Sequence, residues 1–143
     1  MSAEEKRLNL ELALRYIETV ADPSATAEDL RAFLDEGIVW REMPNRFAPR
    51  GRASDYATGL ANFGKGREYL PEQTYTIRRA VADGDTVALE VGWTGEVAKP
   101  IGPFPAGARL SAEVAIFLRF RDGKIVGQTD YPCYAPSPDS APL

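Results

Sequence analysis

The chain has 143 residues, of which 44% are hydrophobic and 27% charged, the composition of one ordinary globular domain. A formal net charge of -4 and the lack of an extended basic stretch exclude nucleic acid as a partner. The sequence has no histidine and one cysteine, Cys133, which excludes an internal disulfide, the usual zinc ligand and every histidine-dependent nucleophile. No apolar run approaches the length of a membrane helix and the first residues are charged, so we expect a cytoplasmic protein without membrane contact.

The N-terminal part of the chain predicts two helices. Apolar residues at a four-residue spacing predict a helix over about residues 4–21, which Pro23 ends. Thr26, followed by Asp29 three positions later, has the pattern of an N-cap with a partial capping box, so a second, short helix is expected to begin there. Gly37 is the expected C-cap of that helix.

A strand over residues 38–43 and a third helix over residues 54–63 are predicted next, and Gly64 and Gly66 are expected to end that helix. The loop between the strand and the helix contains a small basic cluster, formed by Arg46, Arg50 and Arg52. Such a cluster is typical of a solvated loop, and a clamp for an anionic ligand is the alternative.

The second half of the chain predicts four strands, over residues 75–82, 86–97, 109–121 and 124–134. The connection over residues 98–108 holds three prolines and two glycines, so it cannot be a strand. It is either a flap over a pocket or a plain surface loop.

This order of elements predicts an α+β domain, with the helices gathered on one face of a curved antiparallel sheet. We expect a single domain over residues 1–135, followed by a flexible tail over residues 136–143, which is rich in proline and serine.

The environment of Asp130 depends on the turn between the last two strands. A two-residue turn pairs Arg121 with Lys124 and places Asp130 beside Ala115, on a face that also carries charged residues. A three-residue turn shifts the pairing by one and places Asp130 opposite Val114, on the apolar face. A carboxylate on the apolar face is costly unless it is paired or used, so the register decides whether Asp130 belongs to a functional site.

Two segments carry a resemblance to a known superfamily. Residues 40–44, WREMP, end the first predicted strand, and residues 121–125, RDGKI, lead to Asp130-Tyr131. With the order of elements, these segments resemble the nuclear transport factor 2-like superfamily, above all its SnoaL-like polyketide cyclases and limonene epoxide hydrolases; ketosteroid isomerase and scytalone dehydratase share its fold. The resemblance implies a cone-shaped, curved antiparallel or mixed sheet with three helices on its concave face, a cystatin-like α+β barrel.

The resemblance also implies site residues. Asp130 falls at the position of a catalytic aspartate that faces the pocket, which favours the three-residue turn. Glu42 and Trp40 fall where the epoxide hydrolases place polar groups that hold the attacking water, and Tyr16 lies near a catalytic tyrosine of ketosteroid isomerase. Other catalytic positions of the superfamily are altered here. Val91 and Trp93 stand where the hydrolases need an arginine and a second aspartate, and Ile116 stands at the acid of the isomerase oxyanion hole.

The remaining groups form a coherent site by themselves. Glu42 and Asp130 are expected to project into an apolar cone, where burial and mutual repulsion raise their pKa values and allow one to act as acid and the other as base. Gln128, two residues before Asp130, is expected on the same face, where it orients a carbonyl group or a water. The expected walls of the cone are Tyr16, Trp40, Phe63, Val91, Trp93, Val114 and Ile116.

Each assignment has a structural alternative. Asp130 is otherwise a hydrogen-bonded residue at a strand end, and Glu42 a partner in a salt bridge to Arg41, Arg46 or Arg50. The two tryptophans and Tyr16 are otherwise core residues. Cys133 has no basic neighbour in sequence and is expected to be inert.

Two classes of function follow. The first is a cofactor-free enzyme that uses carboxylate acid–base chemistry on a mostly hydrophobic, oxygenated small molecule, as an isomerase, cyclase, dehydratase or epoxide-opening hydrolase. The second is a non-catalytic module of the same fold that binds a small ligand or dimerises. In either case we expect a homodimer through the outer face of the sheet, where an apolar centre is surrounded by charges and Glu113 meets an arginine of the partner. The residues of that face are Glu113, Ala115, Phe117, Arg119, Ile125 and Gly127.

Overall fold

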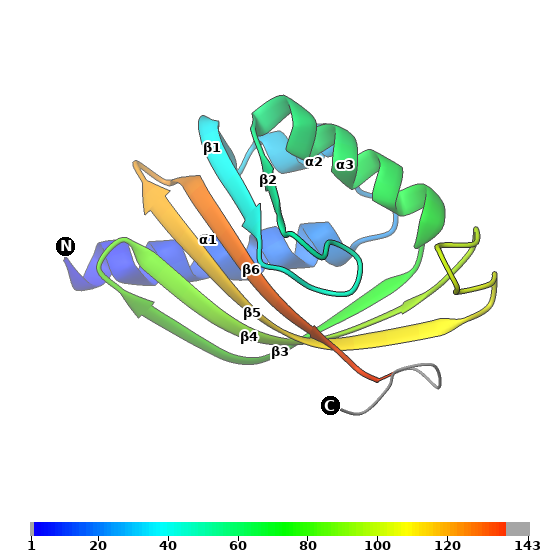
Figure 1. Ribbon diagram of the computed structural model, residues 1–143. Helices are drawn as coiled ribbons and strands as arrows, with labels where there is room; N and C mark the ends of the chain where they lie inside the picture. Colours follow the sequence, from blue (N-terminus) through cyan, green and yellow to red (C-terminus); the bar gives the residue numbers. More distant parts are fainter. Residues whose placement is uncertain (1, 137–143) are drawn as a thin grey trace.

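The structure, a computed structural model, describes residues 2–136 and packs three helices against one six-stranded sheet (Figure 1). The helices are α1 (Ala3–Ala21), α2 (Ala27–Arg31) and α3 (Tyr56–Tyr69). The strands are β1 (Leu34–Glu42), β2 (Arg52–Ser54), β3 (Gln73–Asp83), β4 (Thr86–Glu96), β5 (Arg109–Arg121) and β6 (Lys124–Tyr134). The tail predicted from residue 136 lies outside the described residues from residue 137 onward.

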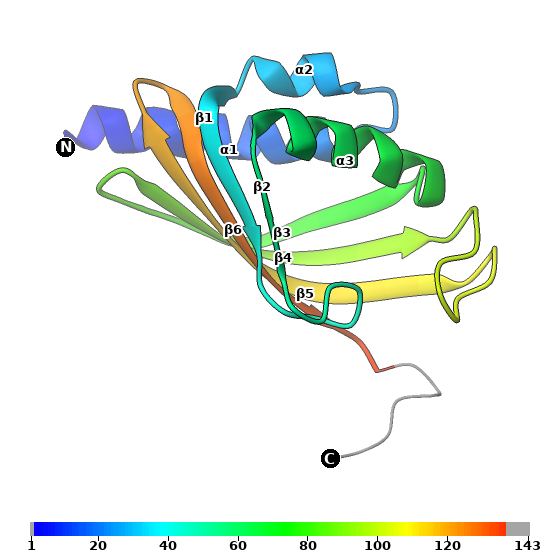
Figure 2. The same cartoon turned by 45° about the horizontal axis from the view of Figure 1, so that its top comes forward.

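The strands pair in the order β2-β1-β6-β5-β4-β3. The β1 and β6 strands run parallel, and the other neighbouring strands run antiparallel. The sheet curves around α1, which crosses its concave side (Figure 1), and Figure 2 shows α2 and α3 on that side as well. The predicted α+β fold with a curved, mixed sheet is therefore confirmed, although the sheet stays open because β2 and β3 are its two edges.

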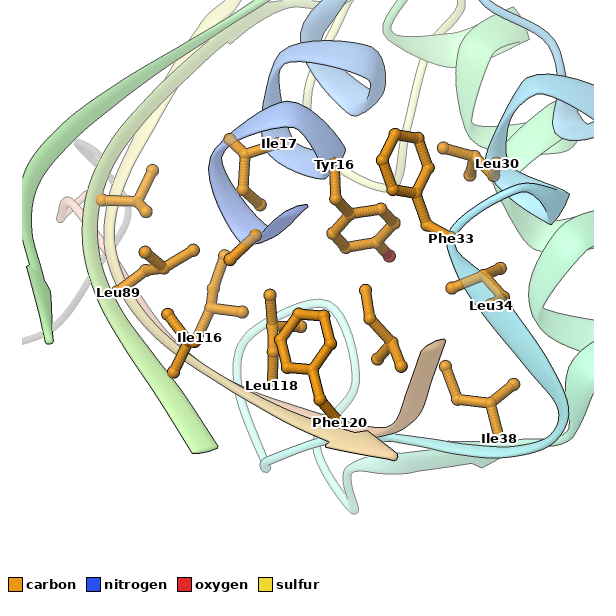
Figure 3. Packing of buried hydrophobic residues seen from close by; sticks show 14 of the residues in the cluster. Tyr16, Ile17, Leu30, Phe33, Leu34, Ile38, Leu89, Ile116, Leu118 and Phe120 are labelled. Carbon is orange, nitrogen blue, oxygen red and sulfur yellow. The ribbon is translucent and has the colours of Figure 1, made fainter. Parts of the chain in front are cut away.

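The main core fills the space between α1 and the concave face. Tyr16 and Ile17 of α1 meet Leu89, Ile116 and Leu118 of the sheet (Figure 3). Truncating a fully buried leucine such as Leu118 costs about 2–5 kcal/mol of stability, because the cavity left behind does not collapse completely.

The sequence patterns predicted the starts of the first two helices correctly. The α1 helix matches its predicted span to within one residue, and the capping box of Thr26 and Asp29 is present at the start of α2. The C-cap predicted at Gly37 is wrong, because α2 ends at Arg31 and Gly37 lies within β1.

The third helix is longer than predicted. Gly64 and Gly66 do not end α3, which continues to Tyr69, and a Cβ at either glycine would meet nothing within 4 Å. These two glycines therefore lower helix propensity without a packing reason. Gly59 differs, because a Cβ there would lie 2.0 Å from ring carbons of Trp40. This close approach seats α3 against β1 and fixes the Trp40 indole.

The β5–β6 hairpin corrects both predicted registers of Asp130. Its turn has two residues, because Arg121 pairs with Lys124 and both Asp122 and Gly123 have positive φ, as a type I′ turn requires. The register then shifts by one between Arg119 and Phe120. Asp130 consequently lies opposite Ile116, and not opposite Val114 or Ala115. The apolar face predicted for Asp130 is right, but a β-bulge and not a three-residue turn places it there.

The two-residue turn also changes the predicted outer face of the sheet, because it pairs Ile125 with Phe120 and not with Arg119. Ile125 is fully buried in the core, so it is not a member of that face. Glu113 accepts two hydrogen bonds from Arg78 of its own chain, with N–O distances of 3.0 and 2.7 Å, so the arginine partner predicted from a second subunit is already supplied internally. Phe117 is exposed, and its ring contacts that of Tyr131 at 5.8 Å.

Candidate active site

Two neighbouring parallel strands position the polar groups of the site. Trp40 and Glu42 of β1 pair with Gln128 and Asp130 of β6. Because side chains two residues apart share one face of a strand, all four point to the concave side. Neighbouring strands are about 4.8 Å apart, so the two carboxylates are side by side in the sheet. The backbone N–H of Met43 also donates to the carbonyl oxygen of Asp130, at 2.9 Å, which ties the strand ends together.

A cavity of about 680 Å³ opens beside this pair. Glu42 and Asp130 line it, as do the predicted wall residues Trp93, Val114 and Ile116. The remaining predicted residues are not among its lining: Tyr16, Trp40, Phe63, Val91 and Gln128. Tyr16, Trp40, Phe63 and Val91 belong to the main core cluster or pack against it, and Gln128 is buried. The cavity thus lies away from α1, between α3, the start of β3 and the end of β4.

Gln128 is the centre of a buried hydrogen-bond network. Its side-chain oxygen accepts from the Tyr16 hydroxyl at 2.6 Å and from the Trp40 indole N–H at 2.9 Å. Because the oxygen accepts from two donors, the side-chain nitrogen of Gln128 points away from Tyr16 and Trp40. This nitrogen donates to the Asp130 carboxylate at 3.0 and 3.3 Å. Gln128 is only 8% exposed, so the expectation that it contacts a substrate carbonyl or a water is replaced by a role in holding Asp130.

The Tyr16 side chain has a structural position. It is 2% exposed, its ring lies 5.7 Å from that of Phe33, and its hydroxyl is committed to Gln128. Burial, followed by the negative charge of Asp130, raises its pKa far above the usual range. Tyr16 therefore stays neutral and does not reach the cavity, which does not support the direct catalytic contact that the resemblance implied.

The Asp130 carboxyl has the electrostatics of a proton-transfer group. Burial raises its pKa from 3.8 to about 6, the Gln128 hydrogen bond opposes that rise, and the nearby charge of Glu42 adds to it. The residue is half-buried, and its exposed part faces the cavity. A carboxyl that titrates close to neutrality at a cavity wall suits a general base or acid.

Glu42 is held by a hydrogen bond from Asn45 and not by the salt bridge to an arginine that was the alternative prediction. The Asn45 side-chain amide donates to Glu42 at 2.8 Å and also to the backbone oxygen of Met43. Asn45 in turn accepts from the backbone N–H of Phe47, so this loop residue fixes both the carboxylate and the chain that follows.

Several polar lining residues were not predicted as site residues. Gln73 accepts hydrogen bonds from Trp93 at 2.8 Å and from Tyr75 at 3.2 Å, and burial raises the pKa of Tyr134 to about 12. The spacing of Gln73 and Tyr75 on one strand face was available as a signal. The lining residues Lys65, Gly66 and Tyr69 of α3 were not, because the helix was predicted to end at residue 63. Asn62 lies within the predicted helix and was not recognised as a lining residue.

The 98–108 connection borders the cavity. Pro100, Ile101 and Gly102 line it, Ile101 pairs with Phe104 through two backbone hydrogen bonds, and the Phe104 ring lies 5.6 Å from that of Phe47. Of the two interpretations of this segment, a wall over the pocket is favoured. Within residues 2–136 there is no group of His, Cys, Asp or Glu side chains suited to a metal, nor a helix of the length and apolarity that a membrane span needs.

The curved sheet with helices on its concave side and a cavity between them defines the nuclear transport factor 2-like fold. A proposed SnoaL-like polyketide cyclase from Jannaschia sp. CCS1 matches with a TM-score of 0.76 and 17% identity, over 92% of this chain and 90% of that one. IdmH, a proposed polyketide cyclase from Streptomyces antibioticus, matches with a TM-score of 0.72 and 21% identity over 87% and 91% of the two chains. An LEH-like epoxide hydrolase from M. tuberculosis matches with a TM-score of 0.69 and 16% identity over 90% and 84%.

The sequence gives a narrower assignment than the fold. A family model described as the SnoaL-like domain matches residues 13–128, and the chain belongs to this family. No curated protein matches the sequence.

Proposed function

We propose that the protein is a cofactor-independent enzyme in which Asp130 transfers a proton to or from a mostly hydrophobic, oxygenated small molecule bound in the cavity. The observation that carries this proposal is that the Asp130 carboxyl has both a raised pKa and an orientation fixed by a hydrogen bond. Asp130 titrates at about 6, so it is mostly ionised at neutral pH, and Gln128 aims its carboxylate. A base with these properties removes a proton from a carbon next to a carbonyl group without a metal.

The other lining groups suit the charge that such a step creates. Proton removal places negative charge on the substrate carbonyl oxygen, and neutral donors at that oxygen stabilise the enolate. Tyr134 and Asn62 line the cavity and remain neutral donors, because the pKa of Tyr134 is raised to about 12 and an amide does not titrate. Glu42, beside Asp130, raises the pKa of Asp130 and so makes it a stronger base.

Among the four reaction types, isomerisation or cyclisation through an enolate fits the site best. Epoxide opening in the hydrolases needs charged groups at the positions of Val91 and Trp93. Here Val91 is buried in the core, and the Trp93 indole donates to Gln73, so neither position supplies a charge to an epoxide oxygen. Polyketide cyclases among the structural relatives are consistent with this choice.

Proton–deuterium exchange tests the proposal without knowledge of the natural substrate. Cyclic ketones and 1,3-dicarbonyl compounds that fit the cavity are incubated in D₂O, and exchange at the carbon next to the carbonyl is followed by NMR. We expect Asp130→Asn to keep the fold and to lower the exchange rate by about a hundredfold or more. Asp85→Asn, at an exposed aspartate beside the β3–β4 turn, is the matched control and is expected to retain the rate.

A thermal-shift screen with the same compounds separates the enzyme from the non-catalytic binder. Compounds that stabilise the wild type but never exchange would identify a binding module of the same fold. Equal exchange by wild type and Asp130→Asn would show that Asp130 is not the proton-transfer group.

A further inference from the structure

Four charged side chains line the cavity. Glu42 and Asp130 lie together on β1 and β6, whereas the two lining cations, Arg52 and Lys65, come from β2 and α3. Both cations are exposed, so they lie at the mouth of the cavity and the carboxylates lie further inside. We propose that Arg52 and Lys65 bind a carboxylate of the substrate. The cavity then takes carboxylic acids whose acid group stays at the mouth and whose carbonyl-bearing end reaches Asp130.

The fold places the two cations on two sides of one opening. The Asn62 amide donates to the Ser54 hydroxyl at 3.5 Å, which joins α3 to β2 at the edge of the sheet. Arg52 is two residues before Ser54 and therefore on the same face of the strand, and Lys65 is one helical turn beyond Asn62. From this contact β2 and α3 diverge (Figure 1), so one cation lies along each element on its cavity side.

Each cation has an acidic neighbour, but that neighbour is held by another residue. Arg52 pairs with Glu42 across the β1–β2 ladder, yet Glu42 is bound by the Asn45 amide, and no ion pair joins it to Arg52. Lys65 stands three residues before Glu68 on α3, yet Glu68 pairs with Lys99 at 3.7 Å. Within the part of the chain that the structure describes, Arg52 and Lys65 make no ion pair, so both remain available to an anion.

The arrangement also fixes the direction in which such a substrate enters. An anionic group is repelled by Glu42 and Asp130 and attracted by Arg52 and Lys65, so the acid group remains at the mouth. The uncharged part of the molecule then occupies the inner cavity, where Trp93, Val114 and Ile116 form an apolar wall. This inference rests on the proposed function for the reacting end, but attraction of the acid group to Arg52 and Lys65 does not require proton transfer by Asp130.

Matched pairs of acids and amides test the inference by calorimetry. The probes are phenylacetate, 1-naphthaleneacetate and 1-pyrenebutyrate, each with its primary amide, in buffer of low ionic strength near pH 7.5. At least one acid is expected to bind the wild type about tenfold or more tightly than its amide, and added salt should weaken the acid alone. In Arg52→Gln/Lys65→Gln the acid should bind no better than the amide, whose affinity stays the same.

Arg41→Gln is the control for net charge. Arg41 is exposed on the opposite face of β1, so its removal changes the charge of the same strand without altering the cavity mouth. Arg41→Gln is combined with Arg121→Gln, near the β5–β6 turn. This pair of changes removes two positive charges, as Arg52→Gln/Lys65→Gln does. This control double variant is expected to retain the preference for the acid.

Three results would overturn the inference: amides that bind as tightly as the acids, no acid that binds, or a preference that survives in Arg52→Gln/Lys65→Gln. Tighter binding of 1-naphthyl phosphate than of 1-naphthaleneacetate would also overturn the choice of a carboxylate. The preference is measured again in Asp130→Asn, where it should persist. Failure of the exchange experiment with a persistent acid preference would refute the proposed function alone.

Discussion

Asp130 should cost the protein stability at neutral pH, and Asp130→Asn should reveal that cost. A carboxyl whose pKa is raised on folding binds its proton more tightly in the folded than in the unfolded protein. Its contribution to the free energy of unfolding is therefore greatest below the unfolded pKa and is lost as pH rises through the folded pKa. With a shift from 3.8 to about 6, the loss amounts to at most about 3 kcal/mol at 1.36 kcal/mol per pKa unit.

Urea unfolding between about pH 4 and about pH 7.5 measures this effect. The stability of Asp130→Asn minus that of the wild type is expected to rise over this range by about 2–3 kcal/mol, because the asparagine carries no charge to bury. Glu113→Gln provides a control of opposite sign. Arg78 lowers the pKa of Glu113, so the stability that this pair contributes is lost as pH falls. A stability difference for Asp130→Asn that does not change with pH would refute the desolvated state of Asp130.

Three further changes test the surroundings of the site. Tyr16→Phe removes a donor to Gln128 and should raise the pKa of Asp130 further, seen as an upward shift of the carboxyl titration by ¹³C NMR; an unchanged titration would contradict the positioning role, and Tyr131→Phe is the control. Gly59→Ala should cost about 1–3 kcal/mol by forcing the Trp40 ring to move, whereas Gly64→Ala, which meets nothing, should gain about 0.5–1 kcal/mol; equal effects in urea unfolding would contradict the close packing. We also propose a homodimer through the outer face, so Phe117→Asp should give a monomer in sedimentation equilibrium and Leu8→Asp on α1 should not; a dimeric Phe117→Asp would exclude this face.

Local chemistry explains which parts of the fold were predictable from the sequence. The capping box at Thr26 and the apolar spacing of α1 are short-range patterns, and both were predicted correctly. The end of α3 was not, because Gly64 and Gly66 have the local appearance of a helix stop. Beyond them, the Arg67 side chain donates to the backbone oxygen of Val20 at 2.7 Å, a long-range contact that no local pattern predicts. The β2 strand was missed because its three residues owe their conformation to pairing with β1.

The two carboxylates of the site could be predicted from the sequence, but the hydrogen-bond network around Gln128 could not. Glu42 and Asp130 carried the resemblance and were placed together, whereas the role of Gln128 depends on two donors from distant parts of the chain. A side-chain amide has an acceptor oxygen and a donor NH₂ group, and the sequence alone does not tell which of the two faces Asp130. The donors from Tyr16 and Trp40 make that choice and turn Gln128 from an expected substrate contact into a support for Asp130.

One unpaired residue, Val126, decides on which face this chemistry lies. The Asp122-Gly123 turn favours a two-residue loop, and a regular ladder from that loop would put Gln128 and Asp130 on the outer face. Between Ile125 and Gly127 the pairing with β5 shifts by one, and the pairing with β1 is irregular at the same place. The shift reverses the alternation of β6 from Gly127 onward, so Gln128 meets its donors and Asp130 faces the cavity. Gly127, an isolated glycine within β6, is a weak local sign of the bulge, and the hydrogen bonds, the raised pKa and the proposed chemistry all depend on that bulge.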